Sequence, residues 1–120
     1  MRTIVLAIGL ITCLLSPAAA FVVEEETLFP ATGVETQILS VLSTTDTAIL
    51  RPVILGFQAR NSSVSVRYTV ASSQEVYAAI HDEGIGYDLV ISSAMDLQMK
   101  LANDGFAARY RSALTDSIPN

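Results

Sequence analysis

The sequence predicts an α/β protein with a mainly parallel sheet, built from three strand–helix units in the order βαβαβα. Three stretches of strand length, at residues 38–42, 64–70 and 87–91, are rich in apolar residues. A segment with apolar residues at helical spacing follows each of them. Strands that alternate with helices in this way join in parallel through right-handed crossovers. We therefore expect the strands to end along a common edge of one sheet.

The first unit begins with the apolar run Ile38–Leu42, which predicts a strand. Asp46 then offers a cap for the helix that follows. Pro52 lies early in this segment, so we expect the helix to be kinked there or to start close to it. The apolar residues that share one face of this helix are Ile49, Leu50, Val53, Ile54 and Phe57.

In the second unit, residues 64–70 alternate strictly between apolar and polar side chains, which is typical of a strand. Ser72 and Glu75 have the spacing of a capping box, in which the hydroxyl and the carboxylate satisfy free amides at a helix start. We expect this helix to end at Gly84. Its predicted inward residues are Val76, Tyr77 and Ile80.

The third unit has its strand at residues 87–91. Ser93 then begins a helix that we expect to close at Gly105. Residues 106–119 predict irregular structure or a short helical turn.

The first 20 residues read as an export signal that is cleaved before Phe21. Arg2 gives this segment a positive start, an apolar run extends over Ile4–Leu15, and residues 18–20 are alanines. The run is shorter than the ~20 residues that span a bilayer. Residues 10–13, which end in the one cysteine, Cys13, faintly resemble a lipoprotein cleavage box. We favour ordinary signal-peptide cleavage over lipidation.

An exported chain without disulfides fits a bacterial periplasm. Residues 21–37 are mixed in character and include the acidic triplet Glu24–Glu26, which we expect to be a solvated lead-in. The sequence therefore divides into a signal peptide at 1–20, a lead-in at 21–37 and an α/β unit at 38–120.

The chain is acidic, with 7 Lys and Arg against 12 Asp and Glu and a net charge of −5. Removal of Arg2 with the signal peptide would bring the net charge to −6. This balance argues against nucleic acid as a partner, because phosphate backbones are held by clustered Lys and Arg. A small anion needs no such charge, since backbone amides at a helix start bind it.

Paired hydroxyls follow each of the three predicted strands. Ligands of open parallel sheets bind beyond the carboxyl ends of the strands, where hydroxyls and free helix amides together hold oxyanions. Ordinary capping is the alternative explanation, because Ser and Thr are preferred N-caps. A cap needs only one hydroxyl, however, which leaves the second to face solvent or ligand. The pairs are Ser43 with Thr44, Ser72 with Ser73, and Ser92 with Ser93.

Other candidate residues have less support. His81, the only histidine, falls near the end of the second predicted helix, where we expect a solvated residue that interacts with the helix dipole. Asp82 and Glu83 beside it could ligate a hard cation, although a solvated position is the simpler interpretation. The sequence has no phosphate-binding glycine loop, nucleophile elbow or metal-ligand cluster. We therefore expect no cofactor and a protein that is not an enzyme.

Four pieces of the sequence, in their order and spacing, carry a family resemblance. The pieces are residues 41–46 (VLSTTD), 52–58 (PVILGFQ), 72–77 (SSQEVY) and 87–101 (YDLVISSAMDLQMKL). The stretch from Leu42 to Tyr110 thereby resembles the type 2 periplasmic solute-binding proteins of ABC transporters, particularly the branch that contains ferric-iron binders. The resemblance implies that residues 38–120 form a partial first lobe of a periplasmic-binding-protein-like fold.

Such proteins are two-lobed clamps that close on a solute and deliver it to a membrane permease. The resemblance therefore implies two partners: a small anionic solute or ferric iron, and ABC permease subunits in the inner membrane. The family's first lobe binds through its strand-end loops, and the ferric binders use an acidic residue after the second helix, which Glu83 matches here. The matching loop positions are Ser43, Thr44, Ser72, Ser73, Ser92 and Ser93.

Two departures limit what the resemblance implies. The iron-coordinating tyrosines of the ferric binders lie in a second lobe that these 120 residues lack, so iron does not follow from the residues present. The chain is also far shorter than the family's members, and we expect a truncated product or a partial sequence.

Two other functions stay open. One is a small α/β hydrolase or transferase that uses a strand-end serine, although His81 would sit at the wrong end of its helix to act as the base. The other is a structural or regulatory fragment that binds nothing.

Overall fold

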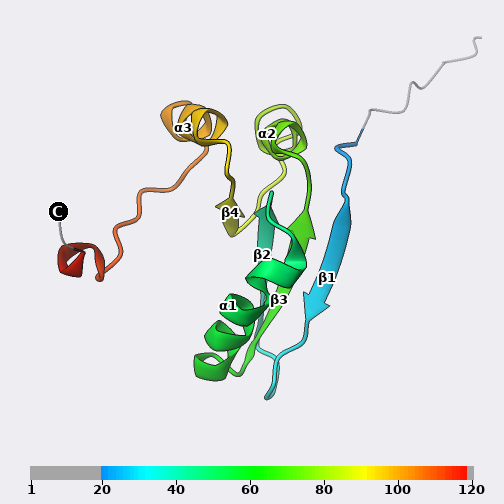
Figure 1. Ribbon diagram of the computed structural model, residues 1–120, viewed down its shortest axis with the longest axis vertical. Helices are drawn as coiled ribbons and strands as arrows, with labels where there is room; N and C mark the ends of the chain where they lie inside the picture. The colour runs from blue at the N-terminus through cyan, green and yellow to red at the C-terminus, as the bar shows by residue number, and fades with distance from the viewer. Residues whose placement is uncertain (1–19, 119–120) are drawn as a thin grey trace, which may run out of the picture.

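Four strands and three α-helices make up the computed structural model, which describes residues 20–118 (Figure 1). The strands are β1 (Glu25–Phe29), β2 (Gln37–Ser43), β3 (Val64–Val70) and β4 (Leu89–Ile91). The helices are α1 (Thr47–Arg60), α2 (Ser73–His81) and α3 (Met95–Asn103), with a 3-10 turn, η1, at Thr115–Ser117. These elements confirm the predicted α/β class. The signal-peptide prediction falls, except for Ala20, outside the described residues.

The sheet has the order β1-β3-β2-β4, and its parallel part is the predicted one. β2 pairs in parallel with both β3 and β4, so these three strands end along one edge. The predicted strand at 64–70 coincides with β3, whereas β4 is shorter than its predicted range of 87–91. Asp88, just before β4, is held against β2: its amide donates to the Ser40 carbonyl at 3.1 Å, and its Oδ2 accepts bonds from the Ser40 hydroxyl and amide at 2.7 and 2.8 Å. These bonds hold the pKa of the Asp88 carboxyl below its usual range.

The N-terminal stretch at 21–37 contains β1, a strand that the sequence does not predict. β1 runs antiparallel to β3, with Glu25 opposite Val70 and Phe29 opposite Val66. The glutamates of this strand are exposed, as expected for the acidic triplet, but Phe29 at its end is buried. The like-charge run conceals the strand because pairing through backbone hydrogen bonds places no demand on those solvated side chains.

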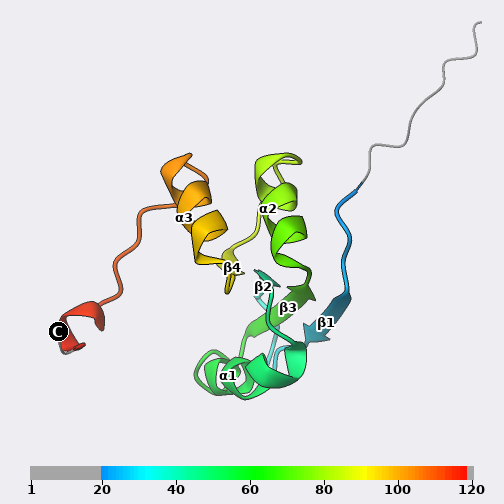
Figure 2. The same ribbon diagram turned by 45° about the horizontal axis from the view of Figure 1, so that its top comes forward.

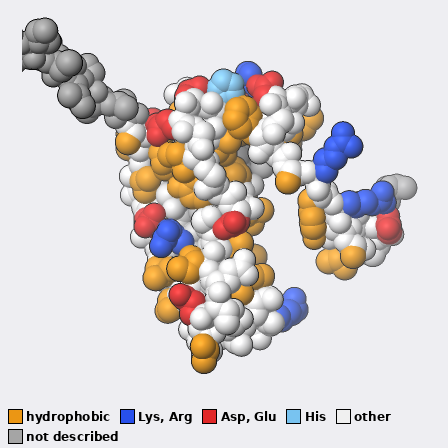
Figure 3. All heavy atoms as spheres, turned by 180° about the vertical axis from the view of Figure 1, so that it is seen from behind, with side chains coloured by type: hydrophobic (Ala, Val, Ile, Leu, Met, Phe, Trp, Pro, Cys, Tyr) orange, Lys and Arg blue, Asp and Glu red, His pale blue; other side chains and the backbone are white. Residues whose placement is uncertain are grey.

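The helices lie on both faces of the sheet, with α1 on one and α2 and α3 on the other (Figure 2). Alternate residues of each strand therefore enter two separate apolar clusters. The cluster on the α1 side contains Phe29, Val41, Ile54, Val66, Tyr68 and Val70. The cluster on the α2 and α3 side contains Leu42, Ala71, Val76, Ala79, Ile80 and Leu101. Covering of the second side is incomplete: Leu28 and Ile38 stay 53% and 42% exposed, and hydrophobic side chains lie at the surface in the view from behind (Figure 3).

The predicted inward face of α1 is wrong in part. Thr47, Ile54 and Gln58 are the buried residues of this helix. The predicted core residues Ile49 and Val53 are each 65% exposed, and Phe57 is 37% exposed. The helix turns toward the sheet around Gln58 because that side chain finds buried backbone carbonyls to bond there.

The ends of α1 also differ from expectation. Asp46 occupies the N-cap position, but its side chain makes no capping hydrogen bond. Pro52 lies inside the helix, which begins at Thr47 and continues to Arg60. Pro52 is the sixth helical residue, past the free amides of the first turn, so its missing N–H leaves the Ala48 carbonyl without its usual intrahelical donor.

The capping box of α2 is half formed. The Ser72 Oγ accepts from the Glu75 amide at 3.3 Å, as predicted. The Glu75 carboxylate accepts instead from the Val22 amide at 2.8 Å, which fastens the N-terminal stretch to α2. The helix ends at His81, before Gly84 takes the left-handed conformation (φ 65) that glycine favours. Within residues 20–118 no helix is both long and apolar enough to cross a membrane.

Candidate solute-binding site at the strand ends

Three corners of the fold meet along the edge where the parallel strands end. β2 leads into α1, β3 into α2 and β4 into α3, so each corner presents a helix N-terminus (Figure 1). The ends of β2 and β3 are tied by a bond from the Ala71 amide to the Ser43 carbonyl at 3.0 Å. The ends of β2 and β4 are tied by a bond from the Thr44 amide to the Ile91 carbonyl, also 3.0 Å. The backbone therefore fixes the corners relative to one another.

The first hydroxyl of each predicted pair serves the local backbone. Ser43 Oγ accepts from the Thr45 amide at 3.0 Å, and the Ser43 side chain is fully buried. Ser72 Oγ caps α2 through the Glu75 amide, and Ser92 Oγ accepts from the Ala94 amide at 3.1 Å. These three hydroxyls are the ordinary turn and cap residues that the alternative explanation expects.

The second hydroxyl of each pair is placed differently. The Ser93 amide donates to Thr44 Oγ1 over 3.1 Å, and the hydroxyls of these two residues lie 3.4 Å apart. This contact brings a side chain from the β2 corner to one from the β4 corner. Ser73, half-buried on the first turn of α2, makes no side-chain hydrogen bond within the described part of the chain. Ser73 is thus the one hydroxyl of the three pairs without a hydrogen-bond partner among the described residues, while Thr44 and Ser93 bond to each other.

Tyr68 supports the β2 corner from inside the α1-side cluster. Its hydroxyl donates to the Thr45 carbonyl at 2.8 Å, and its side chain is fully buried. Burial raises the pKa of this phenol above its ordinary value, while the Ser43 hydrogen bond opposes the shift. The sequence shows Tyr68 in the inward register of its strand but does not indicate this corner contact.

Thr47 is a further buried hydroxyl at the start of α1. Its side chain is 2% exposed, and its Oγ1 has no hydrogen-bond partner among the described residues. Buried hydroxyls without a hydrogen bond are uncommon, because burying one lowers the stability of the fold. Only its position just after the capping residue could have singled it out in the sequence.

The electrostatic character of the corners comes from backbone dipoles rather than side-chain charge. The residues at the corners, 43–46, 71–73 and 92–94, include no lysine, arginine or histidine. The free amides of a helix start carry partial positive charge and attract anions. Asp46, which is exposed, adds a negative charge at one corner, and this charge opposes the attraction of an anion there.

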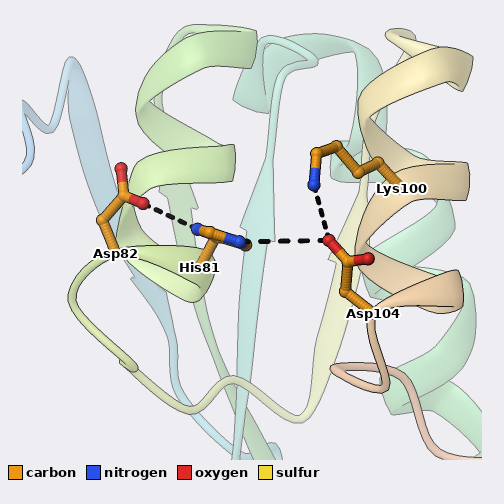
Figure 4. Close-up of polar contacts among 4 residues, drawn as sticks. All are labelled: His81, Asp82, Lys100 and Asp104. Atoms are coloured by element: carbon orange, nitrogen blue, oxygen red, sulfur yellow. Dashed lines mark hydrogen bonds and ion pairs between the residues drawn. The ribbon is translucent and has the colours of Figure 1, made fainter.

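Glu83 and His81 lie at the other end of α2, away from the strand-end edge. His81 Nδ1 lies 2.7 Å from Asp82 Oδ1, and its Nε2 lies 3.9 Å from Asp104 Oδ2 (Figure 4). Lys100 Nζ donates to the same Asp104 carboxylate at 2.6 Å, which holds the pKa of that carboxyl below its usual range. The group ties α2 to α3. Glu83 is exposed, and no cluster of metal-ligating side chains occurs within residues 20–118.

A hollow of about 580 Å³ opens beside β4, but it is not part of the strand-end site. Tyr87 and Leu89, near the start of β4, line it together with Phe106 and Tyr110 from the chain beyond α3. The corners lie at the opposite end of the parallel strands, and none of their hydroxyls lines this hollow.

The strand order and the corners define a class: the chain has the fold of part of a periplasmic-binding-protein-like protein. The particular likeness is to the crystal structure of a substrate-binding protein of an ABC transporter from Agrobacterium tumefaciens. The two share 36% sequence identity over 84% of this chain, with a TM-score of 0.74. The chain spans 31% of that protein's length. No family model and no curated protein matches the sequence.

Proposed function

We propose that this chain belongs to the solute-binding component of an ABC importer and binds a small anionic solute at the strand-end corners. The observation that carries the proposal is the contact of Thr44 with Ser93, because it brings hydroxyls from two corners together at the strand ends. The likeness to a substrate-binding protein supports binding over catalysis. The permease subunits of the importer are the proposed macromolecular partner.

Recognition at this edge would rest on hydrogen bonds alone. Thr44, Ser73 and Ser93 each offer a hydroxyl that donates to an anion oxygen, and the starts of α1, α2 and α3 offer amides. No covalent bond of the solute is made or broken. Ferric iron is the alternative cargo, for which Glu83 stays the proposed ligand, although its distance from the corners along α2 separates it from the hydroxyls.

We expect Thr44→Ala and Ser93→Ala each to weaken anion binding by about tenfold, the effect of one lost hydrogen bond to a charged group. The measurement is calorimetric titration of the purified protein with phosphate, sulfate, a short dicarboxylate and ferric citrate. Ser62→Ala is the control, because Ser62 lies in the turn before β3, at the opposite end of the sheet. Equal affinities in all four proteins, or no binding of any probe, would contradict the proposal.

A hydrolase or transferase centred on a strand-end serine has less support. A nucleophilic serine needs a base within hydrogen-bond reach. His81 closes α2 while Ser72 caps its start, and nine helical residues separate the ends by ~13 Å. His81 is also stacked on Tyr77, with ring centroids 4.8 Å apart, and bonded to Asp82.

We also propose that the protein is exported to the periplasm and that its mature chain begins at Phe21. Phe21 packs against the α2-side cluster and Val22 bonds to Glu75, whereas Ala20 is exposed. Cleavage after Ala20 would therefore leave the N-terminal contacts intact. N-terminal sequencing of periplasmic protein is expected to start at Phe21, and an intact Met1 or a lipidated Cys13 would refute this.

A further inference from the structure

α1 exposes an apolar stripe along its flank. Ile49 and Val53 are each 65% exposed and Phe57 is 37% exposed. Residues four apart lie one above another on a helix, so the three side chains form a continuous row. α1 is the only described helix on its face of the sheet (Figure 2), and no other described helix covers the row. Large apolar side chains in a contiguous exposed row are typical of an interaction surface.

Opposite charges close the two ends of this stripe. Asp46 precedes the helix and Arg60 is its last residue, and both are exposed. Neither side chain forms an ion pair with another residue of the described part of the chain. At about 100° per residue, both charges fall on the same flank as the apolar row.

The stripe is symmetric about its centre. Asp46 and Arg60 lie equally far along the chain from Val53, and so do Ile49 and Phe57. If α1 of a second copy packs antiparallel on this stripe with the two Val53 residues opposite each other, each apolar residue faces an apolar residue and each charge faces the opposite charge. Self-complementarity of this kind is the requirement for an interface with two-fold symmetry.

We propose that the α1 stripe docks a second copy of this chain, with the two α1 helices antiparallel and Val53 at the two-fold axis. Ile49 of each copy then packs on Phe57 of the other, and Asp46 pairs with Arg60 at both ends. The antiparallel arrangement also places each helix N-terminus beside the other's C-terminus, so the interaction between the two helix dipoles is attractive. Gly56 leaves open space where a Cβ would stand, so the backbones can approach closely beside the axis.

A pair of single helices is a small interface, so we expect a weak dimer that forms with increasing concentration. Sedimentation equilibrium of the purified protein, with its N-terminus as processed by the expressing cells, measures the dissociation constant of the dimer. Val53→Glu is expected to raise the dissociation constant by about tenfold or more, because it places two carboxylates against each other at the axis. Leu55→Glu is the matched control: Leu55 is 50% exposed but lies on another side of the helix.

The charge pairing allows a test that misfolding cannot imitate. Asp46→Arg alone and Arg60→Asp alone each place like charges at both ends of a dimer, and each variant is expected to dissociate more readily. Mixing the two variants in equal amounts restores an opposite pair at both ends, because each copy brings the charge that the other lacks. We expect the mixture to dimerise about as tightly as the unaltered protein.

Three results would overturn the proposal. They are a protein that stays monomeric at every concentration, a dimer that Val53→Glu leaves unchanged, and single charge variants that do not associate when mixed. In each case something other than a second copy of α1 would cover the stripe.

Discussion

Replacing Gln58 by leucine is expected to lower the free energy of unfolding by about 2–4 kcal/mol, because it leaves buried carbonyls without donors. Gln58 is 2% exposed, and its Nε2 lies 3.0 Å from the carbonyl oxygens of Phe29, Pro30 and Val64. The side chain therefore joins α1 to the end of β1 and the start of β3. Leucine has a similar volume, so the loss isolates hydrogen bonding from packing.

Urea unfolding of the variant measures this loss. Gln74→Leu is the control, since Gln74 is an exposed residue in the first turn of α2 and should change stability little. A Gln58→Leu protein as stable as the unaltered one would show that water or backbone movement satisfies the three carbonyls.

Tyr68→Phe is expected to cost about 1–2 kcal/mol at neutral pH through the lost bond to the Thr45 carbonyl. It should also reduce the sensitivity of the fold to alkali. Burial raises the pKa of Tyr68 above the ordinary 10.0, so the folded protein keeps a proton that the unfolded chain releases. The stability from this neutral phenol is therefore complete below pH 10.0 and falls as the pH rises through the folded-state value.

Unfolding by urea at neutral pH and above pH 10.0 would measure both effects. Tyr110→Phe provides the comparison, because Tyr110 is 88% exposed and supports no corner. If Tyr68→Phe loses stability in alkali as steeply as the unaltered protein, the titrating group lies elsewhere.

The strands of the parallel sheet could be predicted because their side chains report burial on both faces. β3 was predicted over its full range, since Val66, Tyr68 and Val70 enter one cluster while Thr69 is buried on the other side. β1 could not be predicted in this way. Its first three residues are two exposed glutamates and a half-buried threonine, and its place depends on backbone pairing with β3.

The candidate site divides along a similar line. Pairs of hydroxyls after each strand are visible in the sequence, but their roles are set by contacts between distant corners. Thr44 meets Ser93 only because β2 and β4 are neighbours in the sheet, although β3 lies between them in the chain. The α1 face was mispredicted for a related reason: apolar spacing favoured Val53 and Phe57, whereas a polar residue, Gln58, is buried.

The different hydrogen bonds of the hydroxyls at the three corners have an evolutionary consequence. Ser43, Ser72 and Ser92 are constrained by the turns and the cap that they close, so substitutions there would lower the stability of the fold. Ser73 has no such bond within the described residues, whereas Thr44 and Ser93 join two corners through the bond from the Ser93 amide to Thr44 Oγ1. If the strand-end corners bind a solute as proposed, a descendant of this chain could therefore change its specificity through Ser73 without adjusting its core, whereas Thr44 and Ser93 would have to change together.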